Sequence, residues 1–309
     1  MAGKFKTIIG GQALIEGIYM RGPKKQSVVV NAPDGIKTKV EDIKLIKDRY
    51  PILGWPFIRG IVNFFDSMAK GVSALMYSAN FFPEDENAKP SKMDEWIGRK
   101  FGDKADKLII WVAVFLGVAF SVGLFFIVPT LIASLLRGLI GSRVISSLLE
   151  GLIRVAIFLG YLILCSRLSD MKRVFAYHGA EHKTIHCYEA GLSLNVENVR
   201  KQPRLHPRCG TSFLFTVIVI SILIFMVITA DNVILRVLLR LLLLPVVVGI
   251  SYEINRLAGR YDNRLTRILT APGMWFQHIT TNEPDDDMIR VGIEALKLVI
   301  PEEEGADRW

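Results

Sequence analysis

Long apolar runs dominate the middle of the chain and predict membrane-spanning helices. Four such runs occupy residues 108–136, 148–165, 212–229 and 233–250. A helix needs about 20 apolar residues to cross the hydrocarbon core, because each residue adds only about 1.5 Å of length. The first run exceeds this length and contains Pro129, so we expect it to tilt or kink. The pattern therefore predicts a mainly α-helical polytopic membrane protein with four transmembrane helices.

An amphipathic segment precedes these runs. Residues 57–82 repeat apolar side chains at helical spacing but also carry Arg59, Asp66 and Lys70. Each charge at the centre of a bilayer costs about 2.5 to 3.5 kcal/mol on insertion scales, so a simple span is costly. We expect an interfacial or re-entrant helix, followed by a charged, proline-punctuated connector that completes a segment of residues 57–107.

Short alternating runs in residues 1–56 predict a small β-containing domain. The runs SVVVNA and IKTKV flank Pro33-Asp34-Gly35, where proline presets one turn residue and glycine supplies a positive φ. This chemistry predicts a β-hairpin. The preceding glycine-rich segment, residues 8–23, holds four glycines, which indicate tight turns or a close approach of the backbone to another element.

Residues 251–309 predict a helical segment outside the spans. The last span is expected to continue through SYEINRLAGR, which places Glu253 just beyond the membrane. Residues 265–278 form a further amphipathic stretch that Pro272-Gly273 is expected to interrupt. Polar residues and a proline at 282–285 predict the start of a final helix ending near Pro301.

Composition and charge turn this pattern into a topology. Hydrophobic residues make up 51% of the chain, and the formal net charge is +8. Residues 167–211 hold eight Lys or Arg, residues 137–147 hold two, and residues 230–232 hold none, so the positive-inside rule places the loop 166–211 in the cytosol. Four spans then place both termini on the same side, where the basic surface faces the lipid bilayer. No basic tract interleaved with aromatics indicates direct nucleic-acid readout.

Two further features fit a multi-pass protein of the cell membrane. The three cysteines do not form a disulfide framework, and the N-terminal residues lack the apolar core of a cleaved signal peptide. Two pairs of charged residues interrupt the apolar runs at four-residue spacing, namely Glu150 with Arg154 and Arg236 with Arg240. Pairing between those helices would lower their cost, and structural pairing or snorkelling is the simplest interpretation.

The candidate chemistry is concentrated in residues 177–189, which read YHGAEHKTIHCYE. The chain has only five histidines, and three of them recur here at four-residue intervals, so one helical face would carry all three. Further potential metal ligands lie nearby. The complete candidate ligand set is His178, His182, His186, Glu189, His206 and Cys209.

The five residues 178–182 match H-x-x-E-H, the inverted zinc-protease pattern. In that arrangement His178 and His182 bind the metal and Glu181 acts as general base. A third ligand is required, and the sequence leaves His186, Glu189, His206 and Cys209 open. We expect an open, catalytic site, because closed structural zinc sites are usually richer in cysteine. Solvated histidines on a surface helix without metal are the simpler alternative.

These residues predict a metal-dependent hydrolase that acts at the cytosolic membrane face on a lipid-linked or membrane-protein substrate. The expected cofactor is a divalent metal, with zinc favoured over iron. One alternative is a non-catalytic accessory subunit that docks a membrane-protein biogenesis partner such as the translocon or the ribosome. A second is a di-iron lipid hydroxylase or desaturase, which uses H-x-x-x-H boxes but needs more histidines than the five present.

Four separated segments agree in order and spacing with one family: GGQALIEGIYMRGP, YHGAEHKTIHCYEAG, HPRCGTSFL and TTNEP. Over nearly its whole length the chain resembles the YqhQ-like family, multi-pass bacterial membrane proteins described as predicted metal-dependent enzymes. The resemblance implies that the glycine-rich segment belongs with the site, through Gly10, Gly11, Gln12, Glu16, Gly17, Arg21, Gly22 and Pro23. We therefore expect this segment to pack over the histidine helix, with Glu16 or Arg21 reaching the metal or the substrate. Glu253 and His278 are added as supporting residues.

Overall fold

The computed structural model describes residues 5–44, 49–82, 105–136, 142–228, 232–261 and 263–309. The charged connector predicted before the first span falls largely outside these ranges. The chain divides into two compact units. The first comprises residues 1–82, 162–221 and 243–309, and the second comprises residues 83–161 and 222–242.

The first unit contains the predicted small sheet. Its strands are β1 (Gly10–Leu14), β2 (Gly17–Arg21), β3 (Lys25–Ala32) and β4 (Gly35–Asp42), paired antiparallel in that order. The predicted hairpin is confirmed, since Ala32 pairs with Gly35 and Gly35 has a φ of 118°. The β1–β2 turn differs from the expectation, because its left-handed residue is Glu16 (φ 48°) while the glycines lie beside the turn or within strands.

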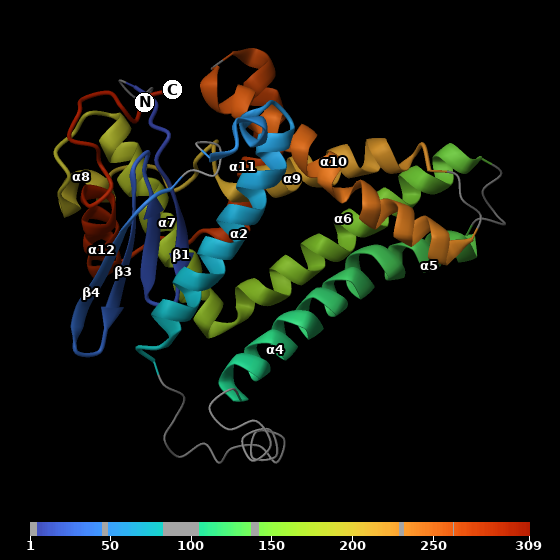
Figure 1. The fold of residues 1–309 in the computed structure, drawn as a ribbon, viewed down its shortest axis with the longest axis horizontal. Helices are drawn as coiled ribbons and strands as arrows, with labels where there is room; N and C mark the ends of the chain where they lie inside the picture. The colour runs from blue at the N-terminus through green and yellow to red at the C-terminus, as the bar shows by residue number, and fades with distance from the viewer. Residues whose placement is uncertain (1–4, 45–48, 83–104, 137–141, 229–231, 262) are drawn as a thin grey trace. The chain divides into compact units, whose positions relative to one another are not determined.

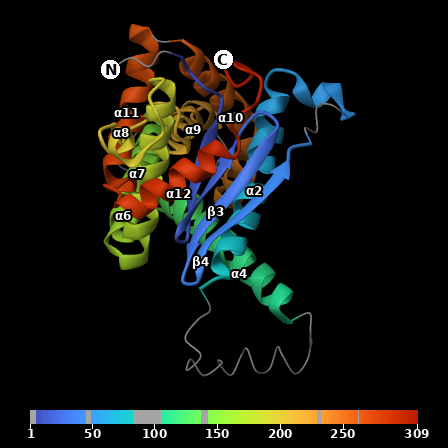
Figure 2. The ribbon, with the colours of Figure 1, turned by 90° about the vertical axis from the view of Figure 1, so that its left-hand side faces the viewer.

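Helices cover both faces of this sheet (Figures 1 and 2). Alternate side chains of a strand point to opposite faces, so Ile18 and Met20 join one core while Tyr19 joins another. The first core is completed by α7 (Ser169–Glu189) and α12 (Asp286–Lys297), and the second by α2 (Ile58–Ala79). The sheet thus presses one face directly against the histidine helix.

Helix α2 confirms the helical pattern predicted for residues 57–82, and ion pairs compensate two of its charges. Arg21 of β2 lies 2.6 Å from Asp66. Arg59 pairs with Glu253 of α10 (Val233–Arg260), and the Glu253 carboxylate also accepts a hydrogen bond from the Phe57 N–H at 3.1 Å. Charges that would be costly in lipid are therefore neutralised within the first unit.

Two helices of the first unit differ in extent from the sequence prediction. Helix α11 (Arg264–Thr280) runs continuously through Pro272, where an interruption was expected. A capping box at Asn263 fixes its start, and Gly273 packs so closely on Ser212 that an added Cβ would lie 2.6 Å from the Ser212 Cα. Tight packing around the proline thus holds the helix together despite one missing N–H. Helix α12 begins after its N-cap Asp285, near the predicted start, and ends at Lys297.

Apolar helices build the second unit. They are α4 (Ala105–Val122), the π-helical turn η3 (Gly123–Ile127), α5 (Val128–Leu136), most of α6 (Arg143–Arg167), and parts of α9 (Gly210–Phe225) and α10. Within the described residues, three stretches are long and apolar enough to cross a membrane: 112–136, 144–167 and 233–260. Helix α9 is apolar but has only 16 residues, so the fourth span is not confirmed.

The irregular turn η3 has a local cause. Pro129 lacks an N–H, so the carbonyl of Phe125, four residues earlier, has no donor there in an α-helical ladder. The Arg154 Nε donates to that carbonyl at 2.8 Å. The expected irregularity near Pro129 is thus a π-helical turn, and a buried arginine from the neighbouring helix satisfies the released carbonyl.

A buried ionic cluster links three helices of the second unit. Glu150 of α6 pairs with Arg240 of α10 and lies 3.3 Å from Arg154, and the Thr130 hydroxyl of α5 donates to Glu150 at 2.7 Å. Glu150, Arg154 and Arg240 are all buried. The predicted pairing between the charged positions of α6 and α10 is therefore confirmed for Glu150 and Arg240.

We expect Glu150→Gln to destabilise the protein by about 3 kcal/mol or more, because it leaves two buried guanidinium groups without their carboxylate. The midpoint of thermal unfolding in detergent micelles measures this loss. The matched control is Glu304→Gln, which removes an exposed carboxylate paired with Arg308 and should change stability by less than about 0.5 kcal/mol. Equal midpoints for the two variants would contradict a stabilising role for the cluster.

Candidate metal centre

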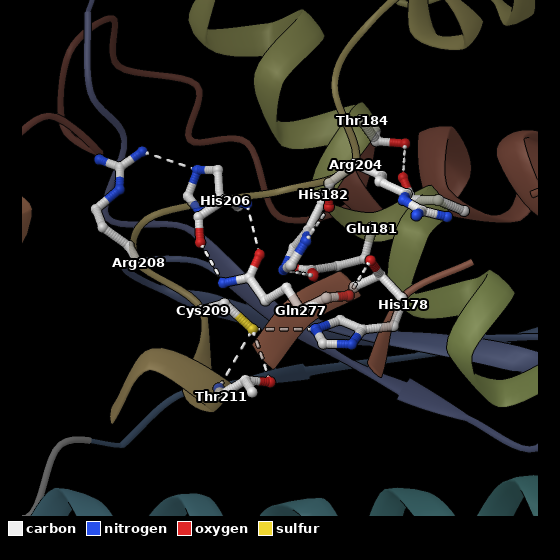
Figure 3. Close-up of polar contacts among 12 residues, drawn as sticks. His178, Glu181, His182, Thr184, Arg204, His206, Arg208, Cys209, Thr211 and Gln277 are labelled. Carbon is white, nitrogen blue, oxygen red and sulfur yellow. Dashed lines mark hydrogen bonds and ion pairs between the residues drawn. The ribbon is translucent and has the colours of Figure 1, made fainter. Parts of the chain in front are cut away.

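Three segments of the first unit build the candidate centre (Figure 3). Helix α7 carries His178, His182 and His186 on one face, as their spacing predicts. The stretch that follows α8 (Val196–Arg200) contributes His206 and Cys209, and the C-terminal end of α11 closes the site. Four of the five histidines therefore gather in one place.

One group of ligand atoms comes from His178, His182 and Cys209, which lie within 4.8 Å of one another. The His178 Nε2 is 3.1 Å from the Cys209 Sγ, and the centroids of the two imidazole rings are 4.4 Å apart. Two imidazoles and a thiolate are ligands that zinc accepts, and three protein ligands are typical of catalytic zinc sites. The structure thus brings Cys209, one of the four candidates that the sequence left open, next to the two histidines.

Backbone carbonyls orient the imidazoles. The His178 Nδ1 donates to the Thr280 carbonyl at 2.9 Å, and the His182 Nδ1 donates to the Arg204 carbonyl at 2.6 Å. A carbonyl only accepts, so each contact requires a proton on Nδ1, and the unprotonated form of each ring then carries its lone pair on Nε2. Metal-binding histidines in proteins are held in this same way.

The electrostatics of His178 and Cys209 favour a proton-sharing pair. Burial opposes charge on both groups, but the nearby His178 and His182 hold the pKa of the Cys209 thiol well below its usual range. Burial is likewise outweighed at His178, where Cys209 and Glu181 raise the pKa to about 9. The thiolate is the form of cysteine that binds metal, and the proton on His178 is one that a cation can replace.

Glu181 lies beside this group and is buried. Its Oε2 is 3.5 Å from the His182 Nε2, and burial raises its pKa against the opposing effect of the two histidines. The backbone of Gly11 covers it, since a Cβ at Gly11 would lie 2.8 Å from the Glu181 Cγ and 2.7 Å from the Tyr19 carbonyl oxygen. The glycine-rich segment therefore packs on the histidine helix, as expected.

A second group consists of His186, Glu189 and His206, whose ligand atoms also lie within 4.8 Å of one another. Here Arg208 already supplies a cation, because its guanidinium pairs with Glu189 and donates to the His206 Nε2 at 3.2 Å. Burial is outweighed by His206 and Arg208, which lower the pKa of Glu189 to about 2. Arg208 thus already compensates the charge of the second group, and the first group is the better candidate for a metal site.

Gln277 is a site residue that the sequence did not reveal. Its side chain is fully buried and pairs with both backbone groups of His206: the His206 N–H donates to Oε1 at 2.7 Å, and Nε2 donates to the His206 carbonyl at 2.8 Å. This pair fixes the stretch that carries His206 and Cys209. A glutamine within an amphipathic stretch gives no signal of that role, and neither do the carbonyls of Thr280 and Arg204.

The supporting residues predicted from the sequence lie in other contacts. Glu16 pairs with Arg173 and Arg21 with Asp66, so the structure uses both as ion-pair partners, and it is the Gly11 backbone that contacts Glu181. The remaining predicted residues make their contacts outside the histidine cluster. Gly17 packs on β3, Gly22 on Val299 and Gln12 on Gly71. Glu253 pairs with Arg59, and His278 is exposed.

Comparisons with known proteins identify relatives of this chain. A family model described as "Protein of unknown function (DUF1385)" matches residues 55–302. The "Uncharacterized protein YqhQ" of Bacillus subtilis (strain 168) is 34% identical over 302 residues, which cover 96% of this chain and 93% of that protein. No solved structure matches.

Gly11→Ala should destabilise the protein by about 1–3 kcal/mol, because the added methyl group overlaps the Glu181 side chain and the β2 backbone. Gly10→Ala is the matched control, since a Cβ there meets nothing within 4 Å, and we expect a change below about 0.5 kcal/mol. Thermal unfolding of both variants provides the measurement. Similar losses at the two neighbouring glycines would show that strand propensity, rather than contact with Glu181, sets the cost.

Proposed function

We propose a function for this chain, which belongs to the DUF1385 family: it is a membrane-associated, metal-dependent hydrolase. The observation that carries the proposal is the convergence of His178, His182 and Cys209, with the buried Glu181 beside them. The family description assigns no activity, so the proposal rests on these side chains and on the apolar helices that continue from the same unit.

The donor set fits zinc. The set consists of two imidazoles, whose Nδ1 protons are held by carbonyls, and one thiol of lowered pKa. Arg208 pairs with Glu189 of the second group instead. Iron fits less well, since it favours carboxylate ligands and Glu189 is already paired with Arg208. When bound, zinc supplies Lewis-acid polarisation of a substrate carbonyl and makes water acidic near neutral pH.

Glu181 is suited to move the proton. Burial raises the pKa of its carboxyl, which brings it closer to neutral pH and lets it accept a proton from water and return it to the leaving group. The Gly11 backbone and His182 hold the side chain, so little reorganisation is needed. His178 and His182 would hold the metal, and the carbonyls of Thr280 and Arg204 orient these two rings.

The chain itself suggests the class of substrate. Cys209 directly precedes the apolar helix α9, and helices α6 and α10, which are long enough to span a membrane, both enter the unit that contains the site. A site joined to such helices by so few residues lies close to the bilayer. We therefore propose a lipid-linked or membrane-protein substrate that is cleaved at the membrane surface.

Purified protein should bind about one zinc per chain, and His182→Ala should weaken binding by at least about 100-fold, because it removes one of three ligands. Elemental analysis after dialysis against a weak chelator measures the content. His278→Ala is the control, since this exposed histidine lies outside the cluster and should leave the content unchanged.

His186→Ala distinguishes the two ligand groups in the same measurement. It should retain the metal, because His186 belongs to the group that Arg208 compensates. Loss of metal from His186→Ala with retention in His178→Ala would move the proposed centre to the second group. Metal-free native protein would remove the proposal.

Glu181→Gln should keep the metal and reduce hydrolysis by about 10²- to 10⁴-fold, because it removes the proton acceptor without removing a ligand. A substrate need not be known in advance. The protein is incubated with solubilised bacterial membranes in ¹⁸O-labelled water, and mass spectrometry detects products that have gained the heavy oxygen. Labelled products that appear equally with the native protein and Glu181→Gln would contradict the role of Glu181 as base.

A further inference from the structure

Helix α11 has an inside-out distribution of side chains. Six of its positions are buried, and only Gly273 and Phe276 among them are not polar. The buried positions are Thr266, Thr270, Gly273, Phe276, Gln277 and Thr280. Its exposed positions include large apolar side chains, with relative exposures of 64% for Leu265, 69% for Ile268, 46% for Leu269 and 58% for Trp275. A helix on a water-soluble surface shows the opposite arrangement.

The polar inner face is stable because its groups are paired. The Thr270 hydroxyl donates to the Thr266 carbonyl at 2.9 Å, and the Thr266 hydroxyl donates to the Asn263 carbonyl at 2.9 Å. Gln277 pairs with His206 and also donates to the Ser212 hydroxyl at 3.2 Å. Burying these groups therefore costs little, and water is not needed on that side.

The exposed apolar face has no comparable compensation in water. Four large side chains at helical spacing form one contiguous stripe, and Trp275 is a residue enriched at membrane interfaces. Arg260 and Arg264 are exposed at the start of this stripe, where long basic side chains can reach lipid headgroups. Apolar and basic side chains on one exposed surface are typical of helices that lie in the plane of a membrane.

The short connection between α10 and α11 also places α11 near a membrane surface. Helix α10 is long and apolar enough to span a membrane, it ends at Arg260, and α11 begins at Arg264. The few residues between them span at most about 14 Å when fully extended. If α10 crosses the bilayer, α11 therefore starts at the surface where α10 emerges.

We propose that α11 lies in the membrane interface, with Leu265, Ile268, Leu269 and Trp275 in the acyl-chain boundary and the arginines at headgroup level. This inference rests on one part of the proposed function, namely that the protein is associated with a membrane. Because Gln277 holds His206 and the Thr280 carbonyl holds His178, the same helix that contacts lipid also positions the candidate metal centre. This placement would put the centre about one helix diameter from the lipid, which favours substrates that reach it from the membrane.

Quenching of Trp275 by lipid tests this placement. The full chain, with Trp275 as its only tryptophan after substitution of the other four by phenylalanine, is reconstituted into phosphatidylcholine and phosphatidylglycerol nanodiscs. Lipids with brominated acyl chains should lower its fluorescence by at least about two-fold, and aqueous acrylamide should have little effect. The matched control carries Trp275→Phe and Lys297→Trp, since Lys297 is exposed on α12, and should show the reverse.

Two outcomes would overturn the proposal. Strong acrylamide quenching of Trp275 without bromolipid quenching would place the helix in water, and protection from both quenchers would show that protein covers the stripe. The readout needs neither metal nor activity, so failure of the proposed hydrolase leaves it intact. Bromolipid quenching that persists in the His182→Ala variant would demonstrate that independence.

Discussion

The hydrogen bonds between imidazole rings and backbone carbonyls organise the candidate centre. His178 and His182 each donate a proton to a carbonyl, and those carbonyls come from two segments that are distant in the chain. If either carbonyl moved, its ring would be free to rotate and to change tautomer, and the lone pairs would no longer converge on Cys209. The packing of α7 against the stretch before α9 and against the end of α11 therefore places these two acceptors.

Two buried carboxylates among the described residues are likewise held by their partners. Glu150 is shared between Arg240 and Arg154, and Glu189 is paired with Arg208. In each case a carboxylate without its partner would be costly, so these groups are positioned as sets. His178 and Cys209 differ from these ion pairs, because the charge of the thiolate is balanced by a proton on a neighbouring imidazole, and both groups are good metal ligands. That difference separates the candidate centre from the structural ion pairs around it.

Helix α11 connects the candidate metal centre with the proposed membrane surface. One face carries the groups that fix His178 and His206, and the other carries a stripe of apolar side chains suited to lipid. Proline within the helix is tolerated because Gly273 allows close packing on Ser212. If α11 lies at the membrane surface as proposed, this helix ties the geometry of the candidate centre to the position of the bilayer.

Local patterns in the sequence determined the elements of this protein. Apolar runs predicted the long helices, alternation around Pro33-Asp34-Gly35 predicted the hairpin, and four-residue spacing placed three histidines on one face of α7, because each depends on short-range periodicity. The charged residues within the apolar runs also predicted pairing between α6 and α10, which is confirmed for Glu150 and Arg240. The length of α9 and the continuity of α11 were predicted less well, since tertiary packing sets where helices end.

Only the tertiary structure decided the composition of the site. It brought Cys209 to His178, assigned Glu189 to Arg208, recruited Gln277, and placed the Gly11 backbone rather than Glu16 or Arg21 beside Glu181. Residues that meet from distant segments leave no periodic signal, and a backbone carbonyl has no residue identity to read. The sequence thus indicated which side chains could bind a metal, and the packing of α7, α9 and α11 decided which of them face one another.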